Sequence, residues 1–339
     1  MTFTTLLLTV VDTVSILFIG DVMQHEAQLH SARLDGADAT IASSYDYSSY
    51  FRYVRPIIEE ADFAAANMEF CLGGPPFTGY PSFSAPESLA EEAADSGIDL
   101  FLCANNHICD KGRRGLLSSL EKYSGIGTPF TGIYRDSLDE AASNPYITEI
   151  RGIRIAFVNF TYGTNGIKVP EPMIVNTMDE DAVRTAIDRA EKSDADIIIA
   201  IPHWGPEYVT EPSSAQRDWA RKLLQWGADA VIGSHPHVVQ PVELPVVYSL
   251  GNFISNMSLR NTELGLAFRL DIAVTLSGLA FLCGGEAIPL WSSRSGGYAE
   301  EFTVLPVKQF LGKRDEFINK HNYDKMKDTY YRLRHLFEK

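Results

Sequence analysis

Five of the eight histidines lie in or beside short segments that follow apolar runs, where carboxylates and amides also gather. Asp21 follows Ile19-Gly20, His203 follows the Ile-rich run 197–201, and His235 and His237 flank a proline. The other polar residues in such positions are His25, Asn67, Glu69, Asn105, Asn106, His107, Glu207 and Asn252. Imidazole, carboxylate and amide groups together suit borderline divalent ions such as Mn, Zn or Fe. No cysteine belongs to this set, which argues against a structural thiolate zinc site.

Two short motifs within this set are the most specific. In Gly233-Ser234-His235-Pro236-His237, two histidines alternate across a rigid proline, so an extended turn would direct both into one site. In Asn105-Asn106-His107, followed by Asp110, the histidine is well placed for proton transfer. Gly20-Asp21 alone is a weak signal because Asp often caps the next helix. Glu207 and Asn252 are explained equally well as ordinary loop and turn residues.

Buried strands that alternate with amphipathic helices carry these residues. Apolar runs predict the strands, and helical spacing of apolar residues predicts the segments between them. The expected strands are 15–20, 62–66, 98–104, 154–160, 197–201 and 230–233, and the expected helices are 51–60, 86–97, 115–123, 179–193 and 214–226. This alternation is typical of an α/β fold, in which ligands bind at the carboxyl ends of strands. From about residue 246, strands such as 263–276 follow without long helices, which predicts antiparallel strands that complete a sheet.

Composition narrows the class of protein. The chain has 339 residues, 45% of them hydrophobic, which is enough for a large core and too much for a disordered chain. A formal charge of −15 disfavours nucleic acid as an extended partner. An anionic polymer could still bind at a local positive site such as a metal ion. The four cysteines form no CxxC pair.

The two ends of the chain differ from the body. The apolar stretch 6–11 is too short to span a bilayer and lacks the basic segment of a signal peptide. Residues 1–14 are therefore either a truncated signal or a lead-in strand, and the compartment stays open. The tail from 308 to 339 is rich in Lys, Arg, Tyr and Phe, which predicts an amphipathic helix that packs on the body. No internal repeat or linker interrupts the chain, so we expect one main domain.

The motifs resemble, in order, those of the bacterial capsule-synthesis proteins called CapA, or PgsA in poly-γ-glutamate systems. That family carries Gly-Asp-Val-Met, Asn-x-Glu, Asn-Asn-His-x-x-Asp-x-Gly, His-x-Gly-x-Glu, Gly-x-His-Pro-His and Ser-Leu-Gly-Asn-Phe motifs. In this chain they occupy 20–23, 67–69, 105–112, 203–207, 233–237 and 249–253. The resemblance covers residues 16–254 and leaves the rest of the chain without strong motifs.

The resemblance implies the fold and the site of the calcineurin-like metallophosphoesterases. The implied fold is two packed mixed β-sheets flanked by helices, a four-layer sandwich over residues 15–305, with 306–339 as a helical tail packed on it. The implied site holds two divalent ions at the strand ends. By motif, the ligands would be Asp21, Asn67, Glu69, Asn106, His203, His235 and His237, the general acid would be His107, and the substrate-binding or supporting residues would be His25, Asn105, Asp110, Glu207 and Asn252.

The chain departs from the phosphoesterase pattern at two ligand positions, as the capsule family does generally. That pattern has Asp-x-His at the first strand, but here residue 23 is Met. It has Gly-Asp-x-x-Asp at the second strand, where this chain has Asn67-Met68-Glu69. The first ion should therefore have a thinner ligand shell, made by Asp21, a group from 67–69 and His237, which His25 completes only if the chain turns just after Asp21.

Three functional hypotheses follow. The first is a metal-dependent hydrolase that acts on a phosphoester or on a polymer amide or ester. The second is a non-catalytic factor that binds or exports an anionic capsule polymer together with other capsule-assembly proteins. The third, a purely structural interaction protein, leaves the residues at the strand ends unexplained. The resemblance also implies a cell-envelope or extracytoplasmic location, although neither an intact signal peptide nor a membrane span is seen in the sequence.

Overall fold

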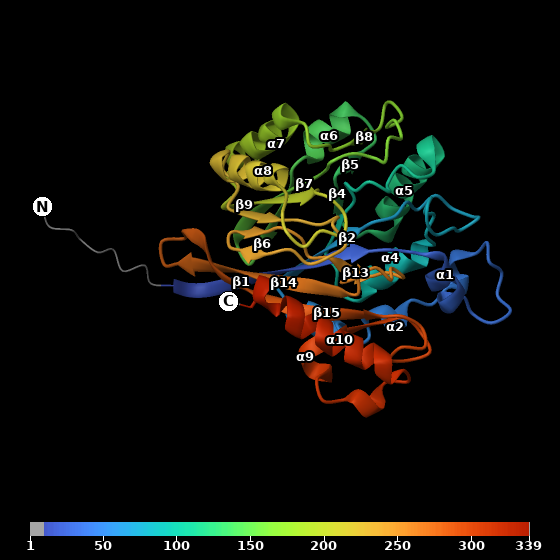
Figure 1. Cartoon of the computed structure of the whole chain (residues 1–339). Helices are drawn as coiled ribbons and strands as arrows, with labels where there is room; N and C mark the ends of the chain where they lie inside the picture. Colours follow the sequence, from blue (N-terminus) through green and yellow to red (C-terminus); the bar gives the residue numbers. More distant parts are fainter. Residues whose placement is uncertain (1–9, 339) are drawn as a thin grey trace, which may run out of the picture.

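Two β-sheets form the centre of the molecule, and the computed structural model describes residues 10–338 of the chain. The larger sheet has eight strands in the order β16-β15-β14-β1-β2-β3-β4, with β13 also paired to β1 (Figure 1). Its strands are β1 Val10–Val22, β2 Phe63–Met68, β3 Leu100–Leu102, β4 Phe130–Thr131, β13 Asn252–Ile254, β14 Leu264–Thr275, β15 Ala280–Ser293 and β16 Thr303–Pro306. β1, β2, β3 and β4 run parallel, whereas β14, β15 and β16 pair antiparallel, as the run of strands late in the sequence predicts.

The second sheet has six strands in the order β11-β12-β10-β9-β7-β6. β7, β9, β10 and β12 run parallel, with β6 and β11 as antiparallel edges. Its strands are β6 Tyr146–Ile150, β7 Ile153–Thr161, β9 Ile197–His203, β10 Ala230–Ile232, β11 Val242–Glu243 and β12 Val246–Val247. A separate pair joins β5 Ile133–Tyr134 to β8 Ile174–Val175.

Three apolar cores show that the molecule has four layers. One core lies between the sheets, where β1 and β2 side chains such as Phe18 and Phe63 meet β7 and β9 side chains such as Phe157 and Ile199. A second core covers the other face of the large sheet with α2, α3, α4 and α5, and a third covers the outer face of the small sheet with α7 and α8. The expected sandwich of two mixed sheets flanked by helices is therefore confirmed.

The helices are mostly short. They are α1 Glu26–Ala32, α2 Ser48–Phe51, α3 Arg55–Glu59, α4 Glu87–Asp95, α5 Gly112–Ile126, α6 Ser137–Ser143, α7 Glu180–Lys192, α8 Ser214–Gln225, α9 Val307–Phe310 and α10 Lys320–Leu333, with 3-10 turns η1 Ala42–Ser44, η2 Arg314–Glu316 and η3 Arg334–Leu336. None of the helices in the described part of the chain has the length and hydropathy needed to cross a membrane.

Two of the expected helices are divided into shorter helices in the structure. The helix expected over 51–60 is broken into α2 and α3, because Pro56 is tolerated only in the first turn of a helix and the chain restarts there. The single helix expected in the tail is divided into α9, η2, α10 and η3, and Gly312 separates the first two with a φ of +90°. Side chains of this tail, including Phe310 and Met326, still pack against the core between the sheets.

The expected N-terminal segment 1–14 divides at the start of β1. Residues 10–14 belong to that strand, and residues 1–9 lie outside the described part of the chain.

Candidate metal centre

The carboxyl ends of the parallel strands from both sheets meet at one place, and polar side chains replace apolar ones there. Asp21 comes from β1, Asn67 and Glu69 come from β2 and the residue that follows it, and His203 ends β9. All four are buried. Because a sheet places the carboxyl ends of its parallel strands along one edge, strand packing alone brings these side chains together.

Close backbone contact positions Asp21. Its N–H donates to Gly251 O at 3.0 Å, and the register pairs it with Asn67 on one side and Asn252 on the other. A Cβ at Gly20 would lie 1.9 Å from Gly251 O, so this approach requires glycine. The Asp21 Oδ1 accepts a hydrogen bond from Asn67 Nδ2 at 2.7 Å. Asp21 Oδ2 accepts from His235 N at 3.3 Å, so both oxygens of Asp21 are held in the site by hydrogen bonds.

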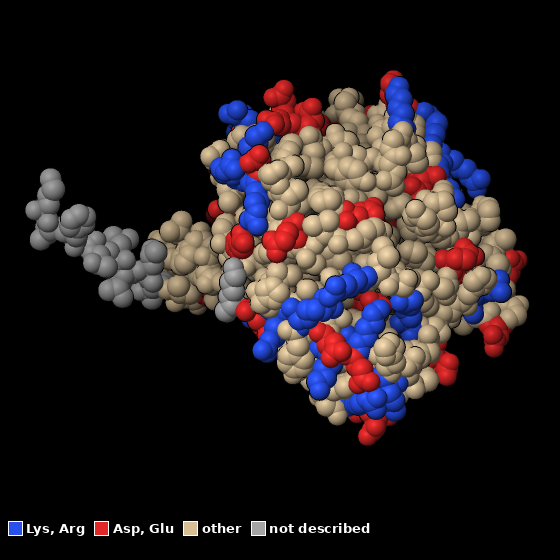
Figure 2. Space-filling view, viewed as in Figure 1, with Lys and Arg blue, Asp and Glu red and all other residues tan. Residues whose placement is uncertain are grey.

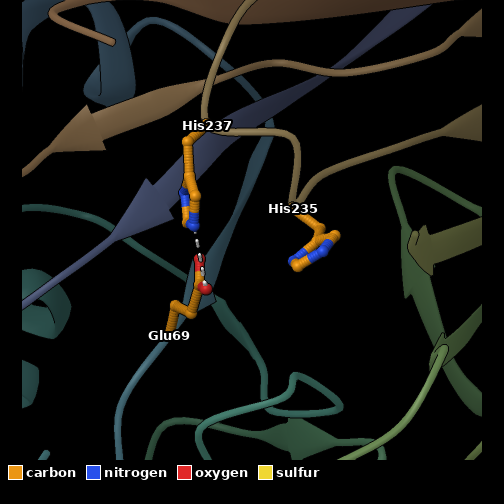
Figure 3. Close-up of side chains that lie close together, drawn as sticks. All are labelled: Glu69, His235 and His237. Carbon is orange, nitrogen blue, oxygen red and sulfur yellow. Dashed lines mark ion pairs between the residues drawn. The ribbon is translucent and has the colours of Figure 1, made fainter. Parts of the chain in front are cut away.

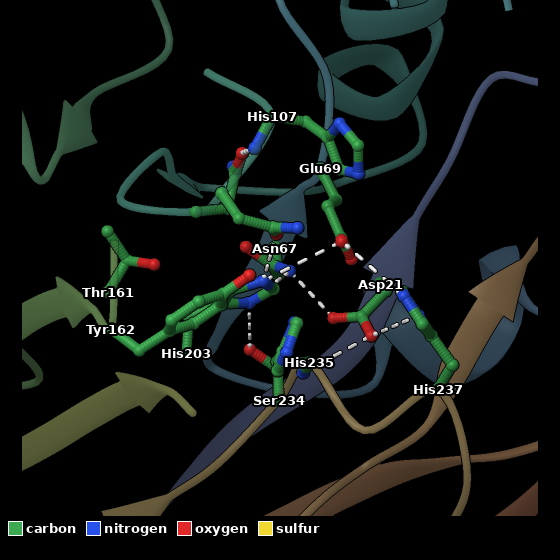
Figure 4. Close-up of polar contacts among 12 residues, drawn as sticks. Asp21, Asn67, Glu69, His107, Thr161, Tyr162, His203, Ser234, His235 and His237 are labelled. Atoms are coloured by element: carbon green, nitrogen blue, oxygen red, sulfur yellow. Dashed lines mark hydrogen bonds and ion pairs between the residues drawn. The ribbon is translucent and has the colours of Figure 1, made fainter. Parts of the chain in front are cut away.

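His203 connects the two sheets. Its Nδ1 lies 3.0 Å from Ser234 Oγ and 3.3 Å from Asn67 Nδ2, while its Nε2 lies 2.7 Å from Asn106 Oδ1 (Figure 4). The same Nε2 lies 3.6 Å from Glu69 Oε1. Ser234 and Asn67 thus set the ring orientation, and the Nε2 edge faces an amide oxygen and a carboxylate.

His235 and His237 both reach this site, but by a different backbone geometry from the extended turn predicted. Both are left-handed, with φ of +98° and +57°, so the chain folds tightly about Pro236. His237 Nδ1 lies 3.3 Å from Asp21 Oδ2 and 2.9 Å from Asn252 Oδ1. The His235 ring lies against His203, with ring centroids 4.7 Å apart. Positive φ at two non-glycine residues is backbone strain of the kind that functional sites retain.

Glu69 is the centre of the arrangement. It is fully buried, its Oε1 lies 3.8 Å from His237 Nε2, and neither carboxylate oxygen has a hydrogen-bond partner. In Figure 3 the carboxylate faces His237, with His235 to the side. Two sets of side chains present ligand atoms within 4.8 Å of one another, namely Glu69 with His235 and His237, and Glu69 with Asp21 and His203. Glu69 belongs to both sets.

The residues fit a divalent metal ion. Ten buried side-chain polar atoms of the described residues lack a partner, and four of them are here: both Glu69 oxygens, Asn67 Oδ1 and His235 Nδ1. Leaving such atoms unpaired costs about 1–3 kcal/mol each. All four are lone-pair donors in one buried place, and carboxylate, amide oxygen and imidazole are the ligands of borderline divalent ions.

The protonation states of the two histidines agree with that use, and an ion would have to displace the proton that burial favours on Glu69. Burial lowers the pKa of His203 to about 3 and places the pKa of His235 well below its usual value. Both rings are therefore neutral, as metal ligation requires. Burial also raises the pKa of Glu69 well above its usual value, helped by the charge of Asp21. For Asp21 itself, burial would raise the pKa, but the hydrogen bond and charge of His237 outweigh it and the pKa is lowered.

His107 lies at the Glu69 side of the cluster (Figure 4). It is held by contacts with Asp110 and Phe83. Its Nδ1 lies 2.8 Å from Asp110 Oδ2, and its ring packs edge-on against Phe83 with centroids 4.5 Å apart. Asn105 supports the loop, because its Oδ1 accepts from His107 N and its Nδ2 donates to Met68 O. Nδ1 is thus occupied by a carboxylate, which leaves Nε2 for chemistry.

Two expected residues lie apart from the cluster. His25 caps α1, where its Nδ1 lies 3.1 Å from Gln28 Oε1 and accepts from Asn256 N. Among the described residues, His25 belongs to neither set of metal-ligand candidates. Glu207 is exposed, although its charge still contributes to raising the Glu69 pKa.

Sequence reasoning missed four neighbours of the site. Ser234 orients His203, and its place inside the Gly233–His237 motif was a usable signal. Tyr162, directly after β7, packs on His235 with ring centroids 4.5 Å apart, and the strand-end pattern could have found it. Tyr208 lies 6.0 Å from the His237 ring, and Asn165 accepts from Asn106 Nδ2. No local signal marks these last two.

Relatives in sequence agree with the motif pattern. The chain is 28% identical over 275 residues to the PGA biosynthesis protein CapA of Bacillus subtilis, covering 74% of this chain and 66% of that protein. It is 26% identical over 238 residues to the capsule biosynthesis protein CapA of Bacillus anthracis, covering 66% of this chain and 57% of that protein. The chain thus spans about two thirds or less of the length of these curated relatives.

Solved structures with similar folds are more distant. NAD nucleotidase of Haemophilus influenzae is 13% identical, with coverage of 95% of this chain and 63% of that one and a TM-score of 0.49. The 5'-nucleotidase of Candida albicans is 11% identical, with coverage of 96% and 59% and a TM-score of 0.46. Likeness at this level assigns no activity.

A family profile shows which family the chain belongs to. The profile described as bacterial capsule synthesis protein PGA_cap matches residues 15–257, most of the chain. That range includes every strand end that contributes to the buried cluster, from Asp21 to Asn252. The chain therefore belongs to the bacterial capsule synthesis family PGA_cap.

Proposed function

We propose that this protein is a metal-dependent hydrolase of capsule polymer synthesis, with a two-ion site that acts on a phosphoester or on a polymer amide or ester bond. The observation that carries the proposal is Glu69, a fully buried carboxylate with two unpartnered oxygens between two sets of ligand atoms. A purely structural carboxylate would be paired. The strand-end donors also follow the order implied by the metallophosphoesterase resemblance.

Each ion would have its own ligands. Asp21, His237 and the amide of Asn67 would hold the first ion, and Asn106, His203 and His235 would hold the second. Glu69 would lie between them, because its Oε1 is 3.6 Å from His203 Nε2 and 3.8 Å from His237 Nε2. Divalent ions of the Mn, Zn or Fe type bound there would supply a water of lowered pKa and neutralise charge on the substrate oxygens. Ser234, Asn252 and Asn67 keep the imidazole rings in place.

His107 would transfer the proton. Asp110 Oδ2 lies 2.8 Å from Nδ1 of its ring, so a proton on Nδ1 is shared with that carboxylate and the tautomer is fixed. The Nε2–H can then donate to the leaving-group oxygen or nitrogen as the bond breaks. Phe83 packs on the ring and limits its rotation, so the donor stays aimed at one place.

The substrate class follows from charge. The chain as a whole is acidic, with a formal charge of −15, so a broad polyanion surface is disfavoured. An anionic substrate would therefore bind narrowly, at the ions themselves. We take a phosphoester as the first candidate and a bond of the capsule polymer as the second. Other capsule-assembly proteins and a cell-envelope location belong to the proposal through the family.

One experiment tests the proposal. Purified protein would be analysed for bound metal and then assayed against phosphomonoesters, phosphodiesters and capsule polymer with added Mn²⁺ or Zn²⁺. Bound metal with turnover supports the hydrolase, and the His107→Ala variant should retain the metal while losing turnover. Bound metal with no turnover on any substrate, but binding of polymer, would instead favour the non-catalytic assembly factor. Protein that takes up no metal would overturn both the site and the mechanism.

A further inference from the structure

The hairpin between β14 and β15 carries exposed apolar side chains at its tip. Leu276 is 75% exposed and Leu279 is 53% exposed, and Val10 and Val11 at the start of β1 are 46% and 54% exposed. Val10 pairs with Thr275, so the four side chains belong to one end of the sheet. We call these four residues and the turn 275–279 the hairpin tip.

The hairpin tip stands out from the body and is uncharged. In Figure 1 the ends of β1, β14 and β15 project beyond the other elements, and Figure 2 shows this projection with almost no blue or red. A Cβ placed on Gly278 would meet nothing within 4 Å, so the turn reaches open space. No Asp, Glu, Lys or Arg occurs in residues 272–285, although 22% of the chain is charged.

Several polar atoms of the turn are bonded within it. Thr275 N donates to Leu279 O at 3.0 Å, Gly278 N donates to Thr275 O at 2.9 Å, and Leu279 N donates to Thr275 Oγ1 at 3.1 Å. The Thr275 and Ser277 hydroxyls also lie 2.9 Å apart. These bonds lower the cost of moving this part of the turn into an apolar medium, and the remaining backbone groups at its end can bond to water or lipid headgroups at the bilayer surface.

We propose that the hairpin tip inserts into the surface of a lipid bilayer and holds the protein there. A bilayer requires only a few apolar side chains on a narrow projection, since each gains by leaving water. A stable protein interface uses about 20–30 residues on each side, far more than the four exposed side chains of the tip. A bilayer is therefore the occupant that the tip fits, and the proposal is independent of the proposed hydrolase activity.

Vesicle binding tests the proposal. Full-length protein would be mixed with phosphatidylcholine vesicles and the bound fraction measured by flotation. We expect wild type to float with the vesicles and the double variant Leu276→Gln/Leu279→Gln to bind about tenfold or more weakly, since two leucines no longer leave water. Leu138→Gln is the matched control, because Leu138 is an 80% exposed leucine in α6, outside the tip, and its loss should leave binding unchanged.

Fluorescence adds a local measurement. In Leu276→Trp, the emission should shift to the blue and be quenched by brominated lipid, whereas Leu138→Trp should show neither change beyond wild type. Three results would overturn the proposal: wild type that does not bind, a double variant that binds as wild type does, or a double variant whose only change is a smaller particle in sedimentation. The last result would show that a second copy covers the tip.

Discussion

The two ends of β1 break the ordinary rules of burial in opposite ways. At the end that carries Asp21, polar atoms are buried without partners, as in Glu69 and His235. At the end that carries Val10, apolar side chains are exposed on a turn that bonds several of its own polar atoms. The two ends lie roughly 35 Å apart along the strand, from a rise of about 3.3 Å per residue.

The contrast teaches which kind of partner each end lacks. Buried lone pairs without hydrogens point to a positively charged ligand, because water or a donor would otherwise be needed there. Exposed apolar side chains on a projecting turn without charged residues point to an apolar surface. The same strand would therefore present an ion-binding end and a lipid-binding end, and the following predictions test each end separately.

The largest effect should come from His107→Ala. Loss of a general acid should lower hydrolytic turnover by about 100-fold or more, while bound metal stays nearly unchanged because His107 contacts Asp110 and Phe83 instead of the ligand set. Asn106→Ala is the comparison, and it should lower metal content as well, since its Oδ1 faces His203 Nε2. A His107→Ala protein that is empty of metal would make His107 a ligand.

The second prediction concerns unequal ions. Met23 offers no imidazole and His25 is engaged with Gln28, so the ion near Asp21 would have one imidazole ligand, His237, whereas the ion near His203 would have two. Dialysis of the loaded protein should remove one ion first, and Asp21→Ala should remove that ion selectively. Metal titration by calorimetry would measure the affinity of each of the two sites. Two equally tight sites that Asp21→Ala leaves intact would contradict the ligand assignment.

The third prediction separates function from stability. In the presence of a chelator, Glu69→Leu should raise the free energy of unfolding by about 1–3 kcal/mol, because it removes a buried carboxylate without partners. The same variant should lose metal binding. Glu211→Leu, at an exposed position, should change stability by less than about 0.5 kcal/mol. Urea unfolding of the metal-free proteins measures these free energies. A Glu69→Leu variant that is less stable than wild type would mean that Glu69 is a structural group.

The fourth prediction is a pH dependence of the metal-free protein. Burial lowers the pKa of His203 to about 3 and of His25 to about 4, and it lowers the pKa of His235 as well. These rings stay neutral in the folded state while the unfolded chain takes up protons below about pH 6.5, so stability falls as pH falls through that value. Each ring contributes a slope of about 1.4 kcal/mol per pH unit.

Glu69 opposes part of this slope. Its pKa is raised in the folded state, so its contribution grows as pH falls toward the unfolded value near 4.5. The lowered pKa of Asp21 matters only below about pH 4. Between about pH 6.5 and 4.5 the net effect is therefore a loss of stability, and His203→Gln should make it shallower. Urea unfolding at several pH values with chelator present measures both slopes, and a flat profile in wild type would contradict the burial argument.

The last prediction is that a variant at one end of β1 leaves the properties of the other end unchanged. Leu276→Gln/Leu279→Gln should leave metal content and turnover in solution unchanged, and His107→Ala should leave vesicle binding unchanged, because distant sites without shared partners are additive. Both readouts come from the assays described above. A tip variant that alters metal affinity would show that β1 couples its two ends.

Much of the candidate site could be predicted because the rule involved is local. An apolar strand followed by Asp, Asn or His identifies the residue at the strand end without knowledge of the neighbours, and this was enough for Asp21, Asn67 and His203. The left-handed φ of His235 and His237 could not be predicted in this way. A proline restricts its own φ and disfavours the helical region for the residue before it, and neither effect calls for a positive φ on either side. That geometry depends instead on contacts with distant residues such as Asp21.

The boundaries of two helices also could not be predicted from the local pattern. Apolar spacing over 51–60 favours one helix, but the proline within it and the packing of Phe51 against Phe253 divide the segment into α2 and α3. In the tail, the number of apolar residues was informative, but their spacing does not predict the break at Gly312. Periodicity reports which side of a segment is apolar, whereas the contacts of the folded chain decide where each helix stops.

By itself, the sequence determined the α/β class, the order of the motifs and most of the polar residues at the strand ends, since these depend on local pattern. Only the tertiary structure decided that Glu69 lies between two ligand sets, that Ser234 orients His203, and that His25 stays with Gln28. It alone also decided that Leu276 and Leu279 are exposed, although their apolar segment is typical of a core strand. The physical reason is that the distances between side chains, and their burial, depend on which segments far apart in the sequence pack together. The pattern of residues along one segment does not determine that packing.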